Sequence, residues 1–253
     1  MALSNLNLER YSRNILLPEI GGVGQEKLLR SKVLVVGAGG LGSPVIMYLS
    51  AVGVGNITII DHDKIELSNL QRQIIHSTEK IGGFKSDSAA SYVNKLNPDI
   101  KVISINKKVS VENVDSLVLN HDVIVDGSDN FETRYLIADS SFKNNKILVA
   151  AAITKYEGQI STWKRNENKY PCFRCLFPNK PKNALVGNCS SNGVIGSLGG
   201  FLGSLQATEV VKEILGIGES LAGFINLYDL LNNNFRKIKI NVDPECKFCR
   251  KYR

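Results

Sequence analysis

Residues 32–42 read KVLVVGAGGLG, and this stretch decides how the chain is interpreted. The apolar run predicts a buried strand at Lys32–Val36, and the glycines after it fit the pattern G-x-G-x-x-G. We predict a helix at Ser43–Val52 and a second strand at Asn56–Asp61. In this strand–turn–helix–strand order, glycines let the backbone approach a phosphate, and the helix N-terminus supplies amide donors.

The turn and the end of the second strand together indicate nucleotide binding rather than a turn that serves packing alone. The glycines assigned to the nucleotide are Gly37, Gly39, Gly40 and Gly42. Asp61 ends the second strand, where a carboxylate accepts hydrogen bonds from ribose hydroxyls. The same fingerprint usually indicates NAD or FAD, so the turn by itself does not choose the nucleotide.

Charged residues around the turn favour a triphosphate. Arg72 and Lys85 follow the second strand and Arg13 lies near the N-terminus, and a triphosphate needs more cations than a dinucleotide pyrophosphate. Asp126 and Asp129 follow a predicted strand, at the edge where parallel sheets bind ligands, and a carboxylate there is a candidate Mg²⁺ ligand. Taken singly, each is more readily a surface ion-pair or helix-cap residue. Because all of these charged residues are expected at one crevice, together they favour a nucleotide-binding site there.

The rest of the pattern predicts an α/β fold, a doubly wound Rossmann-like sheet that is mostly parallel. The elements expected after residue 61 are a helix at 86–95, strands at 101–105 and 123–126, a helix at 130–142 and a strand at 147–152. Period-two patterns predict antiparallel strands that extend the sheet at 158–164, 224–228 and 236–242, with a helix at 204–215. We expect one domain over 1–253, made of a helical arm (1–31), a nucleotide-binding half (32–153) and a second half (154–253).

The cysteines predict a metal site. Two C-x-x-C pairs are formed by Cys172, Cys175, Cys246 and Cys249. Two such pairs close a tetrahedral shell of four thiolates, which is typical of structural zinc, and the alternatives are redox-active or simply buried thiols. Zinc would tie the C-terminal segment to the middle of the chain. Cys189 is left over, either as a nucleophile or as an inert, partly buried thiol.

Composition narrows the class of protein. The net charge is +7, but the lysines are scattered and no basic run alternates with aromatic residues, which argues against nucleic-acid binding. The longest apolar stretch, 194–205, is too short and glycine-rich to span a bilayer, and residues 1–10 contain no apolar segment of a signal peptide. We therefore expect a cytoplasmic protein without a membrane partner.

Longer motifs resemble one family along essentially the whole chain. They are RYSRNILLPEIG at 10–21, GAGGLGS at 37–43, SNLQRQ at 68–73, KSD at 85–87, DGSDN at 126–130, CFRC at 172–175, GSLQA at 203–207 and CKFC at 246–249. In this order and spacing they resemble the MoeB/ThiF/HesA family, relatives of ubiquitin-activating enzymes. One motif departs from the family, since the usual D-C-T-D-N is D-G-S-D-N here and keeps both aspartates.

The resemblance implies an ATP site shared between two subunits. The residues that it places at ATP are Gly40, Asp61, Ser68, Asn69, Gln71, Arg72 and Lys85, with Asp129 and Asn130 as the Mg²⁺–nucleotide wall. Arg13 matches an arginine that reaches the phosphates from the partner subunit, which implies a homodimer. Cys189 aligns with a cysteine that some members use for a carrier thioester or persulfide.

The activity implied by the resemblance is ATP-dependent adenylylation of the C-terminal glycine of a small ubiquitin-like sulfur-carrier protein, MoaD- or ThiS-like, ending in Gly-Gly. The second half of the chain would bind this carrier. The shared motifs leave open whether it serves molybdopterin or thiamine biosynthesis, and a sulfurtransferase is a further candidate partner. The competing interpretations are an NAD-dependent oxidoreductase and a catalytically silent nucleotide-binding scaffold.

Overall fold

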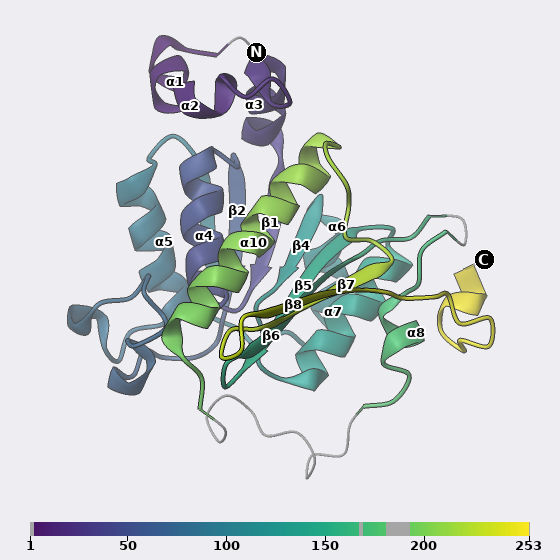
Figure 1. The fold of residues 1–253 in the computed structure, drawn as a ribbon. Helices are drawn as coiled ribbons and strands as arrows, with labels where there is room; N and C mark the ends of the chain where they lie inside the picture. The colour runs from purple at the N-terminus through teal and green to yellow at the C-terminus, as the bar shows by residue number, and fades with distance from the viewer. Residues whose placement is uncertain (1–2, 167–168, 181–192, 253) are drawn as a thin grey trace.

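A computed structural model describes residues 3–166, 169–180 and 193–252. In these residues, one sheet has the strand order β3-β2-β1-β4-β5-β6-β7-β8 (Figure 1). Its strands are β1 (Lys32–Val36), β2 (Asn56–Ile60), β3 (Lys101–Ile105), β4 (Val123–Asp126), β5 (Ile147–Thr154), β6 (Glu157–Trp163), β7 (Phe224–Asp229) and β8 (Asn234–Lys239). Strands β3, β2, β1, β4 and β5 pair in parallel, and β6 to β8 are added antiparallel. The expected fold class is confirmed.

Helices cover both faces of the parallel part. The α-helices are α1 (Asn5–Arg10), α2 (Ser12–Ile15), α3 (Gly21–Arg30), α4 (Gly42–Val52), α5 (Lys85–Leu96), α6 (Val114–Leu119), α7 (Phe131–Lys143), α8 (Phe173–Leu176) and α10 (Gly196–Leu215). Short 3₁₀ turns are η1 (Leu67–Asn69), η2 (Thr78–Lys80) and η4 (Cys249–Tyr252). Helices α4, α5 and α10 lie on one face and α6 and α7 on the other (Figure 1). No helix in the described ranges is long and apolar enough to cross a membrane.

Strand β1 explains why the apolar run is uninterrupted. Val33 and Val35 belong to the apolar cluster that includes α4, α5 and α10. Leu34 and Val36 belong to the cluster that includes α6 and α7. Because a central parallel strand is covered on both faces, both sets of alternating side chains are apolar.

Helix α10 begins much earlier than the residue 204 start that the sequence suggested, because its first turns are rich in glycine, a poor helix former. A Cβ at Gly199 would lie 2.7 Å from the carbonyl oxygen of Gly40, and one at Gly203 would lie 2.6 Å from that of Leu41. These glycines therefore let α10 approach the glycine-rich turn after β1. The short helix α6 was not predicted at all.

His121 is a buried packing residue, 8% exposed. Its Nδ1 lies 2.6 Å from the carbonyl oxygen of Leu117, and its Nε2 lies 2.7 Å from the hydroxyl of Thr58. A neutral ring satisfies both contacts, with Nδ1–H donating to the carbonyl and Nε2 accepting from the hydroxyl. Burial lowers the pKa of His121 below its ordinary value.

We expect the free energy of unfolding to fall as the pH drops below about 6.5, the pKa of an unfolded histidine. The unfolded chain then binds a proton that the folded chain takes up only at lower pH, so stability is lost until the folded pKa is passed. For one histidine, the free energy of unfolding changes by at most about 1.4 kcal/mol per pH unit.

Urea titrations at about pH 7.5 and about pH 5.5 measure this loss of unfolding free energy. The loss between the two pH values should be smaller for His121→Asn than for the wild type. His62→Asn is the control, because the side chain of His62 is 52% exposed. Equal slopes for wild type and His121→Asn would contradict this assignment.

Candidate active site and cysteine cluster

A cavity of about 470 Å³ opens at the carboxyl ends of the parallel strands. It lies where the strand order reverses between β1 and β4, the position at which doubly wound sheets bind ligands. Predicted site residues in its lining are Gly37, Gly39, Gly40, Asp61, Arg72, Lys85, Asp129 and Asn130. The structure therefore brings together residues from five separate segments of the chain around one cavity.

The glycine-rich turn is held in place by its neighbours. Gly37 has a φ of +92°, and a Cβ there would lie 2.8 Å from the carbonyl oxygen of Gly127, so glycine is required. The amide of Ala38 donates to Oδ2 of Asp61 at 2.8 Å, and Nε2 of His76 lies 2.9 Å from the Ala38 carbonyl oxygen. Burial lowers the pKa of His76, which keeps the ring neutral as a donor to this carbonyl. The turn is thus preorganised, and Asp61 supports it besides lining the cavity.

Basic side chains face the same cavity. The stem of Arg72 lies over Gly40, with Cγ 3.5 Å from the position of a Cβ there, and its Nη1 donates to the carbonyl of Ser68 at 3.1 Å. Lys85 opens α5, and its side chain is only 8% exposed. Its Nζ donates to Oδ2 of Asp63 at 2.9 Å. A cation with so little access to water and an open cavity beside it is suited to hold an anionic ligand.

The two aspartates after β4 have different environments. Asp126 is fully buried, pairs with Arg134 and is absent from the cavity lining, so its proposed role as a Mg²⁺ ligand is wrong. Asp129 is exposed, lines the cavity and has no ion-pair partner in the described residues. The side-chain oxygen of Asn130 accepts from the amide of Thr133 at 2.9 Å and caps α7. Of the two carboxylates, only that of Asp129 is available to a ligand in the cavity.

Several predicted residues lie outside the cavity lining. Gly42 is the first residue of α4 and lies beneath the turn. Asn69 forms a capping box with Glu66. Gln71 contacts the start of α10 at Gly196. Ser68 is exposed in η1. Cys189 lies outside the described residues.

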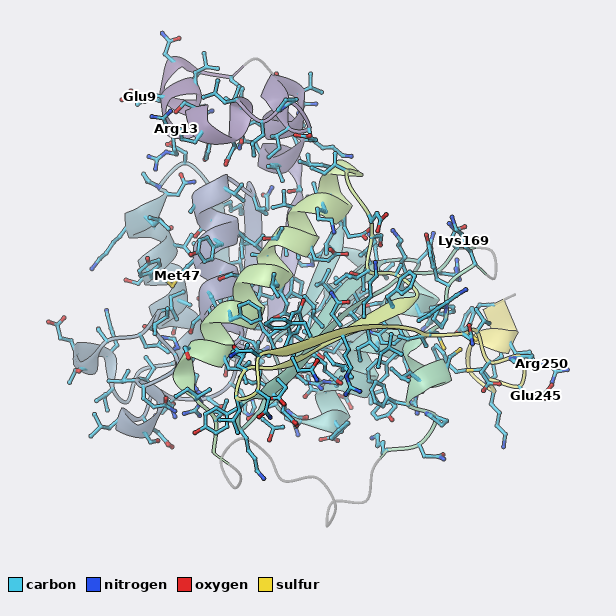
Figure 2. All side chains as sticks on the ribbon, viewed as in Figure 1. Glu9, Arg13, Met47, Lys169, Glu245 and Arg250 are labelled. Atoms are coloured by element: carbon cyan, nitrogen blue, oxygen red, sulfur yellow. The ribbon has the colours of Figure 1, made fainter. Side chains whose placement is uncertain are left out.

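Arg13 lies far from this cavity within one chain. It is exposed in α2, on the helical arm that leads through α3 directly into β1 (Figure 2). The arm therefore lies at the amino ends of the parallel strands, whereas the cavity lies at their carboxyl ends. Arg13 does not reach the cavity of its own chain.

The cavity also contains polar residues that the sequence analysis did not predict, among them Asp63, Gln73, Lys107, Lys108, Arg134 and Arg236. Lys107 and Lys108 lie just beyond the carboxyl end of β3, after Asn106, and the rule that ligands bind at strand carboxyl ends is a signal that would have found them. Arg134 comes one helical turn after Asn130, so its place on the same helix face was readable from the spacing. Arg236 comes from the antiparallel strand β8, and no pattern in the sequence indicated it.

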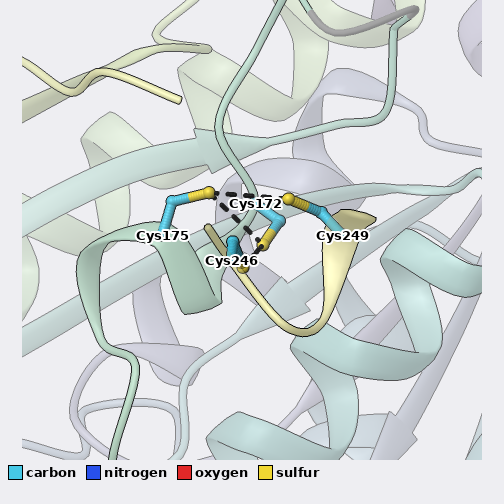
Figure 3. Close-up of side chains that lie close together, drawn as sticks. All are labelled: Cys172, Cys175, Cys246 and Cys249. Atoms are coloured by element: carbon cyan, nitrogen blue, oxygen red, sulfur yellow. Dashed lines mark hydrogen bonds between the residues drawn. The ribbon is translucent and has the colours of Figure 1, made fainter. Parts of the chain in front are cut away.

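The four paired cysteines form a compact cluster (Figure 3). The Sγ atom of Cys172 lies 3.7 Å from those of Cys175 and Cys246, and the Cys175–Cys249 pair is also 3.7 Å apart. Disulfide sulfurs lie about 2.05 Å apart, so these are not disulfides. A tetrahedron with Zn–S bonds of about 2.3 Å has S···S edges of about 3.8 Å, and the cluster fits it.

The cluster joins two distant segments of the chain. Cys172 and Cys175 lie at α8, and the other pair lies in the C-terminal segment that includes η4. Phe142 of α7 and Phe248 pack against it. A hydrogen bond from Cys172 lowers the pKa of Cys175, whereas the same hydrogen bond raises the pKa of Cys172 and burial raises that of Cys249.

Together, the doubly wound sheet and the cation-lined cavity at its switch point define a Rossmann-like nucleotide-binding domain, and the four-cysteine cluster in it has the geometry of a tetrahedral metal site. The chain belongs to the ThiF family, whose profile matches residues 11–248. The family expected from the motifs is confirmed.

Curated relatives align over nearly the whole chain. It is 45% identical over 249 residues to the "SAMP-activating enzyme E1" of Haloferax volcanii, covering 98% of this chain and 91% of the relative. It is 42% identical over 245 residues to the "Sulfur carrier protein adenylyltransferase" of Thermus thermophilus, covering 96% and 90%. The "Adenylyltransferase and sulfurtransferase MOCS3" of Culex quinquefasciatus is 43% identical over 248 residues, but this chain spans only 56% of its length.

Solved structures share the fold. The crystal structure of E. coli MccB with ATP superimposes with a TM-score of 0.83 at 23% identity, covering 95% of this chain and 74% of that one. The similarity in fold includes the antiparallel half, because the superposition covers almost the whole of this chain.

Proposed function

We propose that this protein adenylylates the C-terminal glycine of a small ubiquitin-like sulfur-carrier protein, with ATP and Mg²⁺. The observation that carries the proposal is the cavity at the strand switch point, which combines a glycine-rich turn, Arg72, Lys85 and the exposed carboxylate of Asp129. The names of the relatives that align over at least nine-tenths of both chains support the choice of substrate.

The lining residues fit a nucleotide triphosphate. The turn at Gly37–Gly40 lines the cavity, and its backbone would face the phosphates. Asp61 follows β2, at the position where such folds bind the ribose. Arg72 and Lys85 supply positive charge. Asp129 offers the oxygen ligand that Mg²⁺ prefers, and the ion would neutralise phosphate charge there.

The reaction needs little proton transfer. A terminal carboxylate is already ionised at neutral pH, so no general base is required when it attacks the α-phosphate. The bond to pyrophosphate breaks, and the carrier is left as an acyl-adenylate. Lys85 and Arg72 stabilise the charge that develops on the phosphate oxygens and on the leaving pyrophosphate. Catalysis is then chiefly positioning and charge stabilisation.

The antiparallel half supplies the other end of the cavity. Glu157, Gly158, Tyr228, Asn234 and Arg236 line it beyond the nucleotide residues. A flexible Gly-Gly tail would enter from this side, which assigns carrier binding to residues 154–253. The carrier serves molybdopterin or thiamine synthesis, and a sulfurtransferase acts on the activated glycine.

The four-cysteine cluster holds zinc in this proposal, since its sulfur–sulfur distances match a tetrahedral site. Reduced thiols at such a site support a cytoplasmic location. Cys189 either accepts the acyl group as a thioester while AMP leaves, or receives the outer sulfur of a sulfurtransferase persulfide to become a persulfide itself, or is an inert thiol. The acyl-adenylate is already reactive, so adenylylation itself does not require Cys189.

The direct test of the product is intact mass spectrometry of a carrier incubated with ATP, Mg²⁺ and this protein. The carrier should gain the mass of one adenylyl group, and a carrier without its terminal glycine should not. A carrier that remains unmodified with a correctly folded, ATP-binding enzyme would favour a silent scaffold. Nucleotide-dependent hydride transfer from NADH in place of ATP chemistry would favour an oxidoreductase.

We propose a homodimer in which Arg13 completes the partner subunit's site, because Arg13 cannot reach the cavity of its own chain. Arg13→Ala and Asp129→Ala proteins should each be inactive. After random subunit exchange, half of the dimers are mixed and one site in each regains both residues, so about a quarter of wild-type activity should return. Gel filtration checks that dimers form. Mixed dimers that stay inactive would show that Arg13 does not act across the interface.

A further inference from the structure

Arg134 connects three segments at the cavity wall. It lies in the first turns of α7, and its side chain is only 10% exposed. Its Nε lies 3.0 Å from Oδ2 of Asp126, and its Nη2 donates to the carbonyl oxygens of Ser128 at 2.8 Å and Ala151 at 3.2 Å. One side chain thus joins the end of β4, the loop after it and strand β5.

Asp126 holds the same loop from the other side. Its Oδ1 accepts from the amide of Ser128 at 2.9 Å and from the Ser128 hydroxyl at 2.6 Å. Its backbone carbonyl accepts from Nε2 of Gln206, on α10, at 2.9 Å. The Nε–H of Arg134 is not aligned with Oδ2 for a hydrogen bond, so this pair acts mainly through charge. Removing either partner leaves a buried charge uncompensated.

We propose that Arg134 is a positioning residue for adenylylation. With Asp126, it holds the loop at 127–129 so that the carboxylate of Asp129 already faces the triphosphate and its Mg²⁺ before the nucleotide binds. Preorganised charged groups cost no rearrangement during the reaction, which is why a fixed loop matters here. The inference rests on the proposed function, since it takes Asp129 to act on the nucleotide. It does not need Arg134 to contact the substrate.

Two measurements on the full chain test this role. Amide hydrogen exchange of residues 127–130, without ATP, should be faster in Arg134→Gln than in the wild type, because the loop loses its link to β5. Calorimetric binding of ATP in Mg²⁺ should be weaker by about 10-fold or more, as for other groups that orient ligating residues. Arg134→Lys keeps the charge beside Asp126 but lacks the guanidinium, whose Nε faces Asp126 while its Nη2 donates to both carbonyls. It should give intermediate values in both measurements.

Arg174→Gln is the matched control. Arg174 forms an ion pair with Asp139, also on α7, with contacts of 3.0 and 2.6 Å, and neither residue lines the cavity. Its loss should lower the melting temperature without changing loop exchange or ATP binding. Unchanged loop exchange and ATP affinity in folded Arg134→Gln would overturn the proposal.

Two further outcomes are decisive. If Arg134→Gln does not fold, Arg134→Lys and the neutral pair Asp126→Asn/Arg134→Gln take its place. The neutral pair leaves no buried charge unpaired but still lacks the links to Ser128 and Ala151, so fast loop exchange and weak ATP binding in it would support the proposal. Wild-type exchange and affinity in Arg134→Lys or in the neutral pair would overturn it. If loop exchange responds as expected but the wild type does not bind ATP, the loop-holding role stands and the proposed function fails.

Discussion

Asp129→Ala should abolish carrier-dependent pyrophosphate exchange while leaving the protein folded. Asp129 is exposed, lines the cavity and has no ion-pair partner in the part of the chain that the structure describes. We expect a loss of about 100-fold or more, the size found when one preorganised charge-stabilising group is removed. An exposed residue of this kind contributes little to stability, within about 0.5 kcal/mol. The exchange rate and the melting temperature are the two measurements.

Glu79→Ala is the control for this substitution, because Glu79 is an exposed carboxylate outside the cavity lining. It should exchange at the wild-type rate. An Asp129→Ala protein that also exchanges at the wild-type rate would remove Asp129 from the mechanism. A large drop in melting temperature would mean that the carboxylate supports the fold.

Removal of the metal should destabilise the protein strongly. Elemental analysis should find about one zinc per chain, and Cys246→Ser should lose it. The cluster joins α8 to the C-terminal segment, so losing the metal releases that segment. A structural zinc contributes many kcal/mol, and about 3 °C is lost per kcal/mol in a chain of this size, so a fall of at least about 10 °C is expected.

Cys189→Ser provides the matched control, because Cys189 is the one cysteine outside the two C-x-x-C pairs. It should retain zinc and the wild-type melting temperature. Wild-type protein that contains no zinc, and melts at the same temperature as Cys246→Ser, would contradict a structural metal site.

Sequence patterns gave correct predictions for features that depend on one short segment of the chain. The run at Lys32–Val36 could be assigned because a strand covered on both faces has no polar alternation, and β1 has the predicted bounds. The C-x-x-C spacing predicted the cysteine cluster in the same way. The glycines before residue 204 were misread, since their packing against the turn at Gly40 is a tertiary contact.

The site was predicted only in part, because some of its residues depend on tertiary contacts. Residues at the carboxyl ends of parallel strands, such as Asp61 and Asp129, were placed by topology alone. The sequence spacing did not distinguish the environments of Asp126 and Asp129, because only the folded structure shows that Asp126 is buried against Arg134. Arg236 depends on where an antiparallel edge strand crosses the cavity, which no local pattern encodes.

Carrier-dependent exchange of labelled pyrophosphate into ATP tests the central claim most directly. Exchange requires reversible formation of an acyl-adenylate, so it reports the proposed reaction and no other property of the cavity. The account predicts exchange with ATP, Mg²⁺ and a ubiquitin-like carrier ending in Gly-Gly, and none with the same carrier lacking its last glycine. A panel of molybdopterin- and thiamine-type carriers would show which one is used. Absence of exchange with every carrier, from folded wild-type protein that binds ATP, would contradict adenylylation.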